Sequence, residues 1–170
     1  MQFNVASLLK EPAGAARIFT IDDDVAIDGA PRRIRGQARF DRTQRGVLVR
    51  ADAHGAMDGL CSRCVKPIAY AVDIEFAEEY IPTIDLASGA AVQIDEGDDP
   101  DAYRIDARHM IDLAEPVAQY WALALPMAPV CDEACNGLCP VCGEEIAASE
   151  HPCTGDQIDS RWSALARLEF

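Results

Sequence analysis

The segment PRRIRGQARFDRTQRGVLVR, Pro31–Arg50, decides the fold class, because apolar and charged residues alternate on both sides of a turn. A period of two residues is the signature of a strand with one buried face. The apolar positions are Ile34, Gly36, Ala38 and Phe40 before the turn RTQRG, and Val47, Val49, Ala51 and Ala53 after it. We therefore expect an antiparallel hairpin whose charged side chains share one exposed face.

The alternation returns once more along the chain, and a helical pattern follows it. Ile68–Phe76 predicts a third strand that ends near Glu79. Three antiparallel strands with one solvent-exposed face fit this pattern. Residues 112–125 predict a helix, where Asp112 and Glu115 have the spacing of a capping box. Its apolar stripe, which we expect in the core, is Leu113, Val117, Tyr120, Trp121 and Leu125.

These patterns indicate an α+β fold: an antiparallel β-sheet body with a few helices and a cysteine-rich, zinc-ribbon-like C-terminal lobe. We expect the body to cover residues 1–130, with a short docked helix or ordered arm near the N-terminus. The lobe covers residues 131–170, including a terminal helix, and is tied to the body through Cys61 and Cys64. Residues 88–101 are rich in Gly and Asp, so we expect an exposed loop there.

The charge of the chain excludes general binding to anionic surfaces. The 170 residues carry a formal net charge of −14, whereas nucleic acids and anionic membranes are bound through clustered Lys and Arg. The distribution is uneven, since residues 1–60 carry +1 and residues 61–170 carry −15. The region suited to RNA phosphates is an arginine set within Pro31–Arg50: Arg32, Arg33, Arg35, Arg39, Arg42, Arg45 and Arg50.

The sequence offers no membrane or secretion signal. No segment approaches the ~20 apolar residues that a spanning helix needs. The opening MQFNVASLLKEP lacks the basic start and apolar run of a secretory leader. We expect a cytoplasmic protein without a membrane partner.

The seven cysteines fall in two zones, and their number predicts two metal sites. In a reducing compartment, paired C-x-x-C motifs indicate metal ligation rather than disulfides, and two pairs complete the tetrahedral thiolate set that Zn²⁺ prefers. Two sites need eight ligands, and His151 in EHPC is the natural eighth. The first predicted site is Cys61, Cys64, Cys131 and Cys135; the second is Cys139, Cys142, His151 and Cys153.

Other arrangements of these ligands remain open from the sequence. A single zinc ion can be held by the cluster Cys131–Cys142 alone, or by the two C-x-x-C pairs. An iron–sulfur cluster uses similar thiolates, and reduced core cysteines need no metal. His54 and His109 have no ligand spacing around them.

The motifs indicate a binding protein rather than an enzyme. A saturated thiolate site is closed and structural, whereas a catalytic zinc ion keeps an open position. The chain also has no nucleophile elbow, P-loop or dinucleotide-binding glycine run, and we expect no small-molecule substrate. A thiol oxidoreductase would need a thioredoxin-like frame around C-x-x-C, and that frame is missing.

The chain resembles the YceD family, the large ribosomal RNA subunit accumulation proteins of bacteria and plastids. Five stretches carry the resemblance: NVASLLKEPAGAAR, LCSRCVKPI, IDLAEPVAQYWALALPMAPVC, CNGLCPVCGEE and DSRWSALARL. The family pattern has a Cys-x-Cys pair after the CPVCG knuckle, where this chain has His151 and Cys153. Ser160 replaces a proline of that pattern.

The resemblance implies a non-enzymatic role in building or accumulating the large ribosomal subunit. Two partners are then open. One is precursor large-subunit ribosomal RNA, bound through the arginine set. The alternative is a basic ribosomal protein or assembly factor, shielded by this acidic protein without direct RNA contact.

Overall fold

The computed structural model describes residues 1–85, 88–92, 102–146 and 161 of the chain. Two compact units divide it. Unit 1 comprises Met1–Asp58 and Ala69–Met127, and unit 2 comprises Gly59–Ile68 and Ala128–Phe170. His151, Cys153 and the helix expected near the C-terminus lie outside the described residues, as does most of the expected loop at 88–101.

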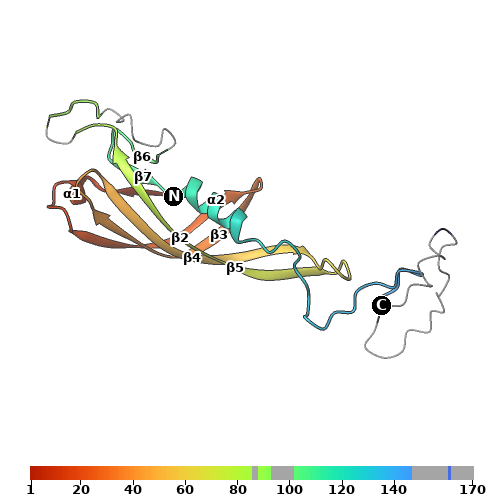
Figure 1. The fold of residues 1–170 in the computed structure, drawn as a ribbon. Helices are drawn as coiled ribbons and strands as arrows, with labels where there is room; N and C mark the ends of the chain where they lie inside the picture. Colours follow the sequence, from red (N-terminus) through yellow and green to blue (C-terminus); the bar gives the residue numbers. More distant parts are fainter. Residues whose placement is uncertain (86–87, 93–101, 147–160, 162–170) are drawn as a thin grey trace, which may run out of the picture. The chain divides into compact units, whose positions relative to one another are not determined.

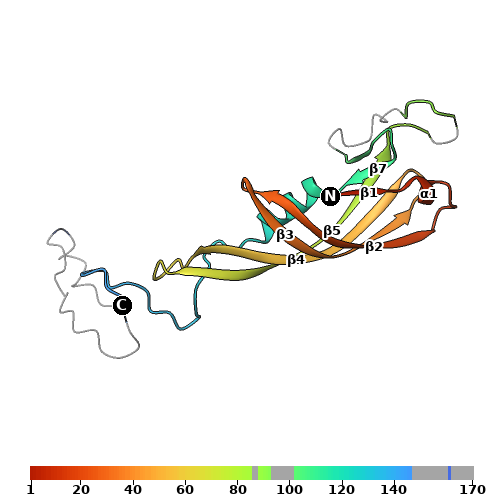
Figure 2. The same cartoon turned by 180° about the vertical axis from the view of Figure 1, so that it is seen from behind.

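A five-stranded sheet forms the body of unit 1, in the order β2-β3-β4-β5-β6 (Figures 1 and 2). β2 pairs antiparallel with β3, and β3 with β4, whereas the short β6 runs parallel to β5. All three strands expected from the alternation are confirmed, and each is longer than predicted. The strands are β2 (Ala16–Ile27), β3 (Ala30–Arg42), β4 (Val47–Leu60), β5 (Pro67–Pro82) and β6 (Arg104–Ile105).

Strand β2 was not expected, because three aspartates interrupt its apolar alternation at Asp22–Asp24. Pairing along the full length of β3 holds these residues in the strand despite their low β-propensity. Ile21, Val25 and Ile27 still point into the core. The ladder with β3 therefore overrides the local preference of the aspartates.

A second, two-stranded sheet pairs β1 (Gln2–Asn4) with β7 (Met110–Asp112). The helix expected over 112–125 is α2 (Ala114–Ala124), and its predicted start at Asp112 is wrong because that residue ends β7. The expected capping box is also wrong. The Asp112 carboxylate accepts the Ala114 N–H at 2.9 Å, but the Glu115 carboxylate accepts from the Gln119 amide instead of reaching back.

The core of unit 1 lies between the sheet and α2, which crosses one face of the sheet (Figures 1 and 2). The predicted stripe is confirmed, since Leu113, Val117 and Trp121 are fully buried and Tyr120 and Leu125 pack beside them. Gly55 of β4 makes room for the indole, because an added Cβ would lie 2.7 Å from a ring carbon of Trp121. The residues of α1 (Ala6–Leu9) add Leu8 and Leu9 to this core.

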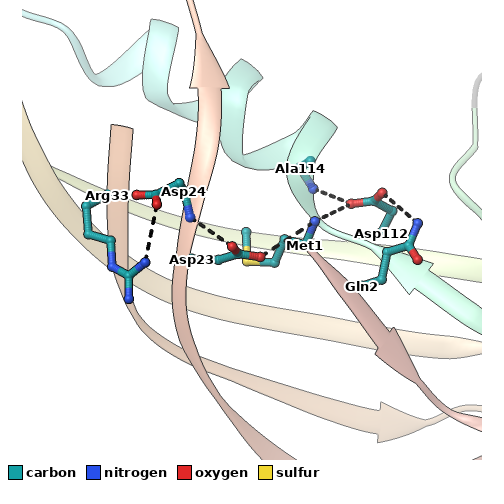
Figure 3. Close-up of polar contacts among 7 residues, drawn as sticks. All are labelled: Met1, Gln2, Asp23, Asp24, Arg33, Asp112 and Ala114. Atoms are coloured by element: carbon teal, nitrogen blue, oxygen red, sulfur yellow. Dashed lines mark hydrogen bonds and ion pairs between the residues drawn. The ribbon is translucent and has the colours of Figure 1, made fainter. Parts of the chain in front are cut away.

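Polar contacts hold the start of the chain against β2 and the start of α2 (Figure 3). The amino group of Met1 lies 3.3 Å from the Asp112 carboxylate and 3.9 Å from that of Asp23. The Ala114 N–H and this amino group lower the pKa of Asp112, although partial burial opposes them. Asp23 has the parity of the buried residues Ile21 and Val25 on β2, but its side chain is 55% exposed, and this ion pair gives its charge a partner.

Candidate metal centre

The segment Cys61–Lys66 folds into a tight turn around the first C-x-x-C motif. The Cys61 N–H donates to the Lys66 carbonyl at 2.8 Å, and the Val65 N–H returns to the Cys61 carbonyl at 2.9 Å. The Arg63 N–H points at the Cys61 Sγ atom, 3.4 Å away. These bonds present two sulfur atoms on one side of the turn and place a backbone donor beside one of them.

Hydrogen bonds within unit 2 join this turn to the segment that carries Cys131 and Cys135. The Arg63 guanidinium donates to the carbonyl oxygens of Glu133 and Cys135, both at 2.9 Å. Ser62 donates its N–H and its hydroxyl to the Pro129 carbonyl, each at 2.8 Å. The two segments, about 70 residues apart in sequence, are thereby held side by side.

The four sulfur atoms of Cys61, Cys64, Cys131 and Cys135 form one cluster in which all lie within 4.8 Å of one another. The Cys61 and Cys135 sulfurs are 4.0 Å apart, and those of Cys64 and Cys131 are 3.6 Å apart. A tetrahedral zinc ion with Zn–S bonds of ~2.3 Å requires sulfur atoms about 3.8 Å apart. The cluster therefore has the ligand set and the spacing to hold a metal ion.

The electrostatics of the cluster also favour a cation. Backbone N–H groups, that of Cys64 first, lower the pKa of the Cys61 thiol to about 6. The neighbouring Cys135 side chain, followed by that of Cys64, raises the pKa of Cys131 to about 12. One thiolate thus forms readily while another is suppressed by its neighbours. A divalent cation removes this repulsion and allows all four groups to ionise.

The second C-x-x-C motif, Cys139–Glu144, repeats the hydrogen bonds of the first turn. The Cys139 N–H donates to the Glu144 carbonyl at 2.7 Å, and the Gly143 N–H returns to the Cys139 carbonyl at 2.9 Å. The Val141 N–H lies 3.4 Å from the Cys139 Sγ atom, the same distance as in the first turn. Cys139 and Cys142 therefore have the local geometry of a second ligand pair.

The two turns differ at the residue that follows the second cysteine. Val65 adopts a φ of +61° there, and Gly143 a φ of +76°. A β-branched residue in this left-handed region is strained by about 1–2 kcal/mol, whereas glycine is not. Val65 also leaves an apolar side chain 55% exposed.

We predict that Val65→Gly stabilises unit 2 by about 1 kcal/mol, because relief of strain exceeds the added freedom of the unfolded chain. Gly143→Val should weaken the second turn by about 1–2 kcal/mol. Hydrogen exchange of the amides of both turns measures each effect. Val141→Gly is the control for chain entropy and should only destabilise; equal protection in wild type and Val65→Gly would contradict the strain argument.

The structure places the arginine set on more than one face of unit 1. Arg33, Arg35, Arg39 and Arg50 lie on the solvent-exposed face of the sheet, as expected from the alternation. Arg32 and Arg42 have the opposite parity on β3 and are half-buried, so the set does not form a single face. Arg45 is exposed in the turn between β3 and β4.

Most residues of the arginine set form ion pairs with aspartates, a pairing that the sequence pattern did not predict. The register of β2 on β3 sets Arg35 opposite Asp22 and Arg33 opposite Asp24, and ion pairs of 2.8–3.4 Å follow from it. Arg39 and Arg50 face each other across β3 and β4, and the Asp41 carboxylate bridges them at 2.8 and 2.5 Å.

The aspartate segment before β3 was the available signal for these pairs, because a hairpin places residues on either side of its turn opposite one another. Arg33 and Arg35 lower the pKa of Asp22 through this pairing. Arg32 pairs similarly with Asp58, at 2.9 Å. The exposed face of the sheet is therefore a mosaic of opposite charges.

Comparison with known proteins places the chain in a family. A family model described as large ribosomal RNA subunit accumulation protein YceD matches residues 49–169, which include both cysteine zones. Uncharacterized proteins of Mycobacterium bovis and Mycobacterium tuberculosis are 33% identical over 130 residues, 76% of this chain and 59% of theirs. One of Mycobacterium leprae is 28% identical over 145 residues, 82% of this chain and 60% of its own.

The chain thus matches about three fifths of the length of these curated relatives. No solved structure gives a significant match. Among the described residues, no helix has both the length and the apolar character to cross a membrane. The family match spans most of the chain and coincides with the paired cysteine motifs, so the chain belongs to the YceD family of large ribosomal RNA subunit accumulation proteins.

Proposed function

We propose that this protein is a non-enzymatic zinc-binding factor in the biogenesis of the large ribosomal subunit. The observation that carries the metal part is the cluster of Cys61, Cys64, Cys131 and Cys135, whose sulfur spacing suits one tetrahedral ion. Thiolate ligands favour zinc over magnesium or calcium, which prefer oxygen. The family match supports the ribosomal part.

The role of this zinc ion is structural. Four sulfur ligands complete a tetrahedral shell, so no position is left for water or substrate. The ion would join two segments that, among the described residues, are otherwise linked by hydrogen bonds of Ser62 and Arg63. Metal binding therefore supplies much of the folding free energy of unit 2.

A second zinc ion at Cys139, Cys142, His151 and Cys153 is part of the proposal. The equivalence of the two turns supports it, because the hydrogen bonds around Cys139 match those around Cys61. His151 and Cys153 lie outside the described residues, and they are included because two four-ligand sites need eight ligands. Gly137 lies between Cys135 of the first site and Cys139 of the second. It has a φ of +78°, and an added Cβ would lie 3.0 Å from the Arg63 carbonyl, so a glycine here lets the chain pass closely from one site to the next.

We further propose that the exposed arginines of the sheet contact ribosomal RNA phosphates. Exposed ion pairs contribute little free energy, typically 0.2–1 kcal/mol, and they are screened by salt. Phosphates can therefore compete with the carboxylates of Asp22 and Asp41 for the same guanidinium groups. The side chains best placed are Arg33, Arg35, Arg39 and Arg50, each about half exposed or more.

The second candidate is an acidic module that binds a basic ribosomal protein or assembly factor. Two observations favour it: the arginines already have internal partners, and β5 presents Asp73, Glu75 and Glu79 outward on the same sheet. Because β5 is acidic and the arginines of the same sheet are balanced by aspartates, this surface attracts cationic partners.

Salt titration of binding to large-subunit ribosomal RNA separates the two candidates. If the arginines contact phosphates, the logarithm of the binding constant falls steeply with the logarithm of salt concentration, and Arg39→Ala with Arg50→Ala reduces the slope by about one unit per contact. Asp41→Asn releases both arginines and should tighten binding. The matched control Asp73→Asn should leave the slope unchanged. If the slope is flat and Asp41→Asn has no effect on RNA binding, the result favours the protein partner.

A further inference from the structure

A cavity of about 590 Å³ opens in unit 1 beside the turn that joins β3 to β4. Its polar lining comes from the end of α1, this turn, and the segment after β5. These residues are Lys10, Arg42, Gln44, Arg45 and Asp85. Among the described lining residues, Lys10 and Arg42 are cations without a carboxylate partner, whereas Arg45 and Asp85 each interact with a further group. Two such cations in the lining of one cavity suit an anionic ligand.

Arg42 is held in the wall of this cavity without a carboxylate partner in the described part of the chain. Its terminal nitrogen donates to the carbonyl oxygens of Thr43 and Gly46, the latter at 2.9 Å. Its Nε atom is buried and has no hydrogen-bond partner there. The other arginines of β3 bind aspartates, whereas the Arg42 guanidinium binds backbone carbonyl oxygens, which leave its positive charge uncompensated.

Hydrogen bonds and close packing hold the turn that presents Arg42. The Thr43 N–H donates to the Gly46 carbonyl at 3.0 Å, and the Gly46 N–H returns to the Thr43 hydroxyl at 2.9 Å. Thr43 also donates its hydroxyl to the Glu79 carboxylate at 2.8 Å. An added Cβ on Gly46 would collide with the Tyr80 carbonyl, so the turn packs directly on β5. A donor that is already held in place loses little entropy on binding a ligand.

The charges around Arg42 favour an anion. Lys10 follows α1, is exposed, and its ammonium group has no partner among the described residues. One oxygen of the opposing carboxylate, Asp85, accepts hydrogen bonds from the N–H and the hydroxyl of Ser88 at 2.8 and 2.7 Å. Leu9, Ile84 and Val92 add apolar walls that suit a ribose or a base.

We propose that this cavity binds a phosphate group carried by a nucleotide, with Arg42 and Lys10 as the main ligands. Guanidinium and ammonium groups make strong, charge-assisted hydrogen bonds to phosphate oxygens. A volume of about 590 Å³ is in the range that holds a nucleotide-sized ligand. Assigning the phosphate to an RNA strand rests on the proposed function, whereas phosphate binding itself does not.

The experiment titrates the zinc-loaded, 170-residue protein with inorganic phosphate, adenosine monophosphate and a 5′-phosphorylated single-stranded oligoribonucleotide. Backbone amide NMR shifts follow residues 9–10, 42–46, 84–85 and 88–92. We expect all three probes to shift these residues, and Lys10→Glu to weaken each at least about tenfold. Since Lys10 is exposed, this variant should fold normally. Arg108→Glu is the matched charge-reversal control, because Arg108 is exposed and lies outside both the cavity lining and the arginine set, and it should retain the affinity for phosphate.

The three probes also distinguish the sources of the phosphate. Tighter binding of the oligoribonucleotide than of the mononucleotide, lost in Lys10→Glu, supports an RNA strand in the cavity. Equal binding of both supports a free nucleotide, and the cavity proposal then stands without RNA. RNA binding that shifts only the exposed face of β3 and resists Lys10→Glu overturns the cavity proposal but leaves the proposed function. No shift at residues 42–46 with any probe also overturns it.

Discussion

Cys61→Ser should unfold a segment that lies about 70 residues further along the chain. If the proposed zinc ion joins Cys61–Lys66 to the segment of Cys131 and Cys135, loss of one ligand disrupts that link. Structural zinc in small domains contributes about 10–16 kcal/mol of apparent binding free energy at neutral pH. We therefore expect amide hydrogen exchange in residues 131–139 to accelerate by at least about 100-fold, while β3 keeps its protection.

The matched control for this variant is Ser62→Ala. It removes the hydroxyl that donates to the Pro129 carbonyl but leaves all four sulfur ligands in place. The loss of one exposed hydrogen bond should cost about 0.5–1.5 kcal/mol, so exchange should change by roughly tenfold or less. Unchanged protection of residues 131–139 in Cys61→Ser would show that these residues fold without Cys61.

Trp121→Ala should have the largest effect on unit 1. The indole is fully buried between α2 and the sheet, and the sheet has a glycine at position 55 where the ring needs space. Truncation of a buried Trp typically lowers the free energy of unfolding by about 3–5 kcal/mol. The indole Nε1 atom has no hydrogen-bond partner in the described structure, so the cost is expected to come from lost packing.

Chemical denaturation followed by far-ultraviolet circular dichroism measures this change. Leu123→Ala is the control on the same helix, because Leu123 is 79% exposed and its truncation should change stability by less than about 0.5 kcal/mol. Similar midpoints for Trp121→Ala and wild type would mean that α2 does not close the core of unit 1.

Alternation decided how much of the fold could be predicted. β3, β4 and β5 have apolar residues at every second position, and their burial follows that pattern. β2 and β7 lack such a pattern, because their place depends on partners elsewhere in the chain. Distant pairing also explains why α2 begins at Ala114 and not at the predicted Asp112, since Met110–Asp112 pairs with β1 and Asp112 is therefore part of a strand.

The candidate sites, too, could be predicted from the sequence only in part. The four cysteines that ligand counting grouped into the first site lie within 4.8 Å of one another, and their binding of a metal ion stays a prediction. The arginine set was visible in the sequence, but its aspartate partners were fixed by strand register. The cavity beside Arg42 combines residues from three separate segments, so the linear sequence contained no signal for it.

Native mass spectrometry of the reduced protein, for wild type, Cys61→Ser and Cys142→Ser, tests the zinc proposal most directly. We expect two zinc ions in wild type and one in each variant, because the two cysteines belong to different sites. Retention of the wild-type zinc content by Cys61→Ser would show that Cys131, Cys135, Cys139 and Cys142 close a local site, and that the cluster with Cys61 and Cys64 does not bind the metal.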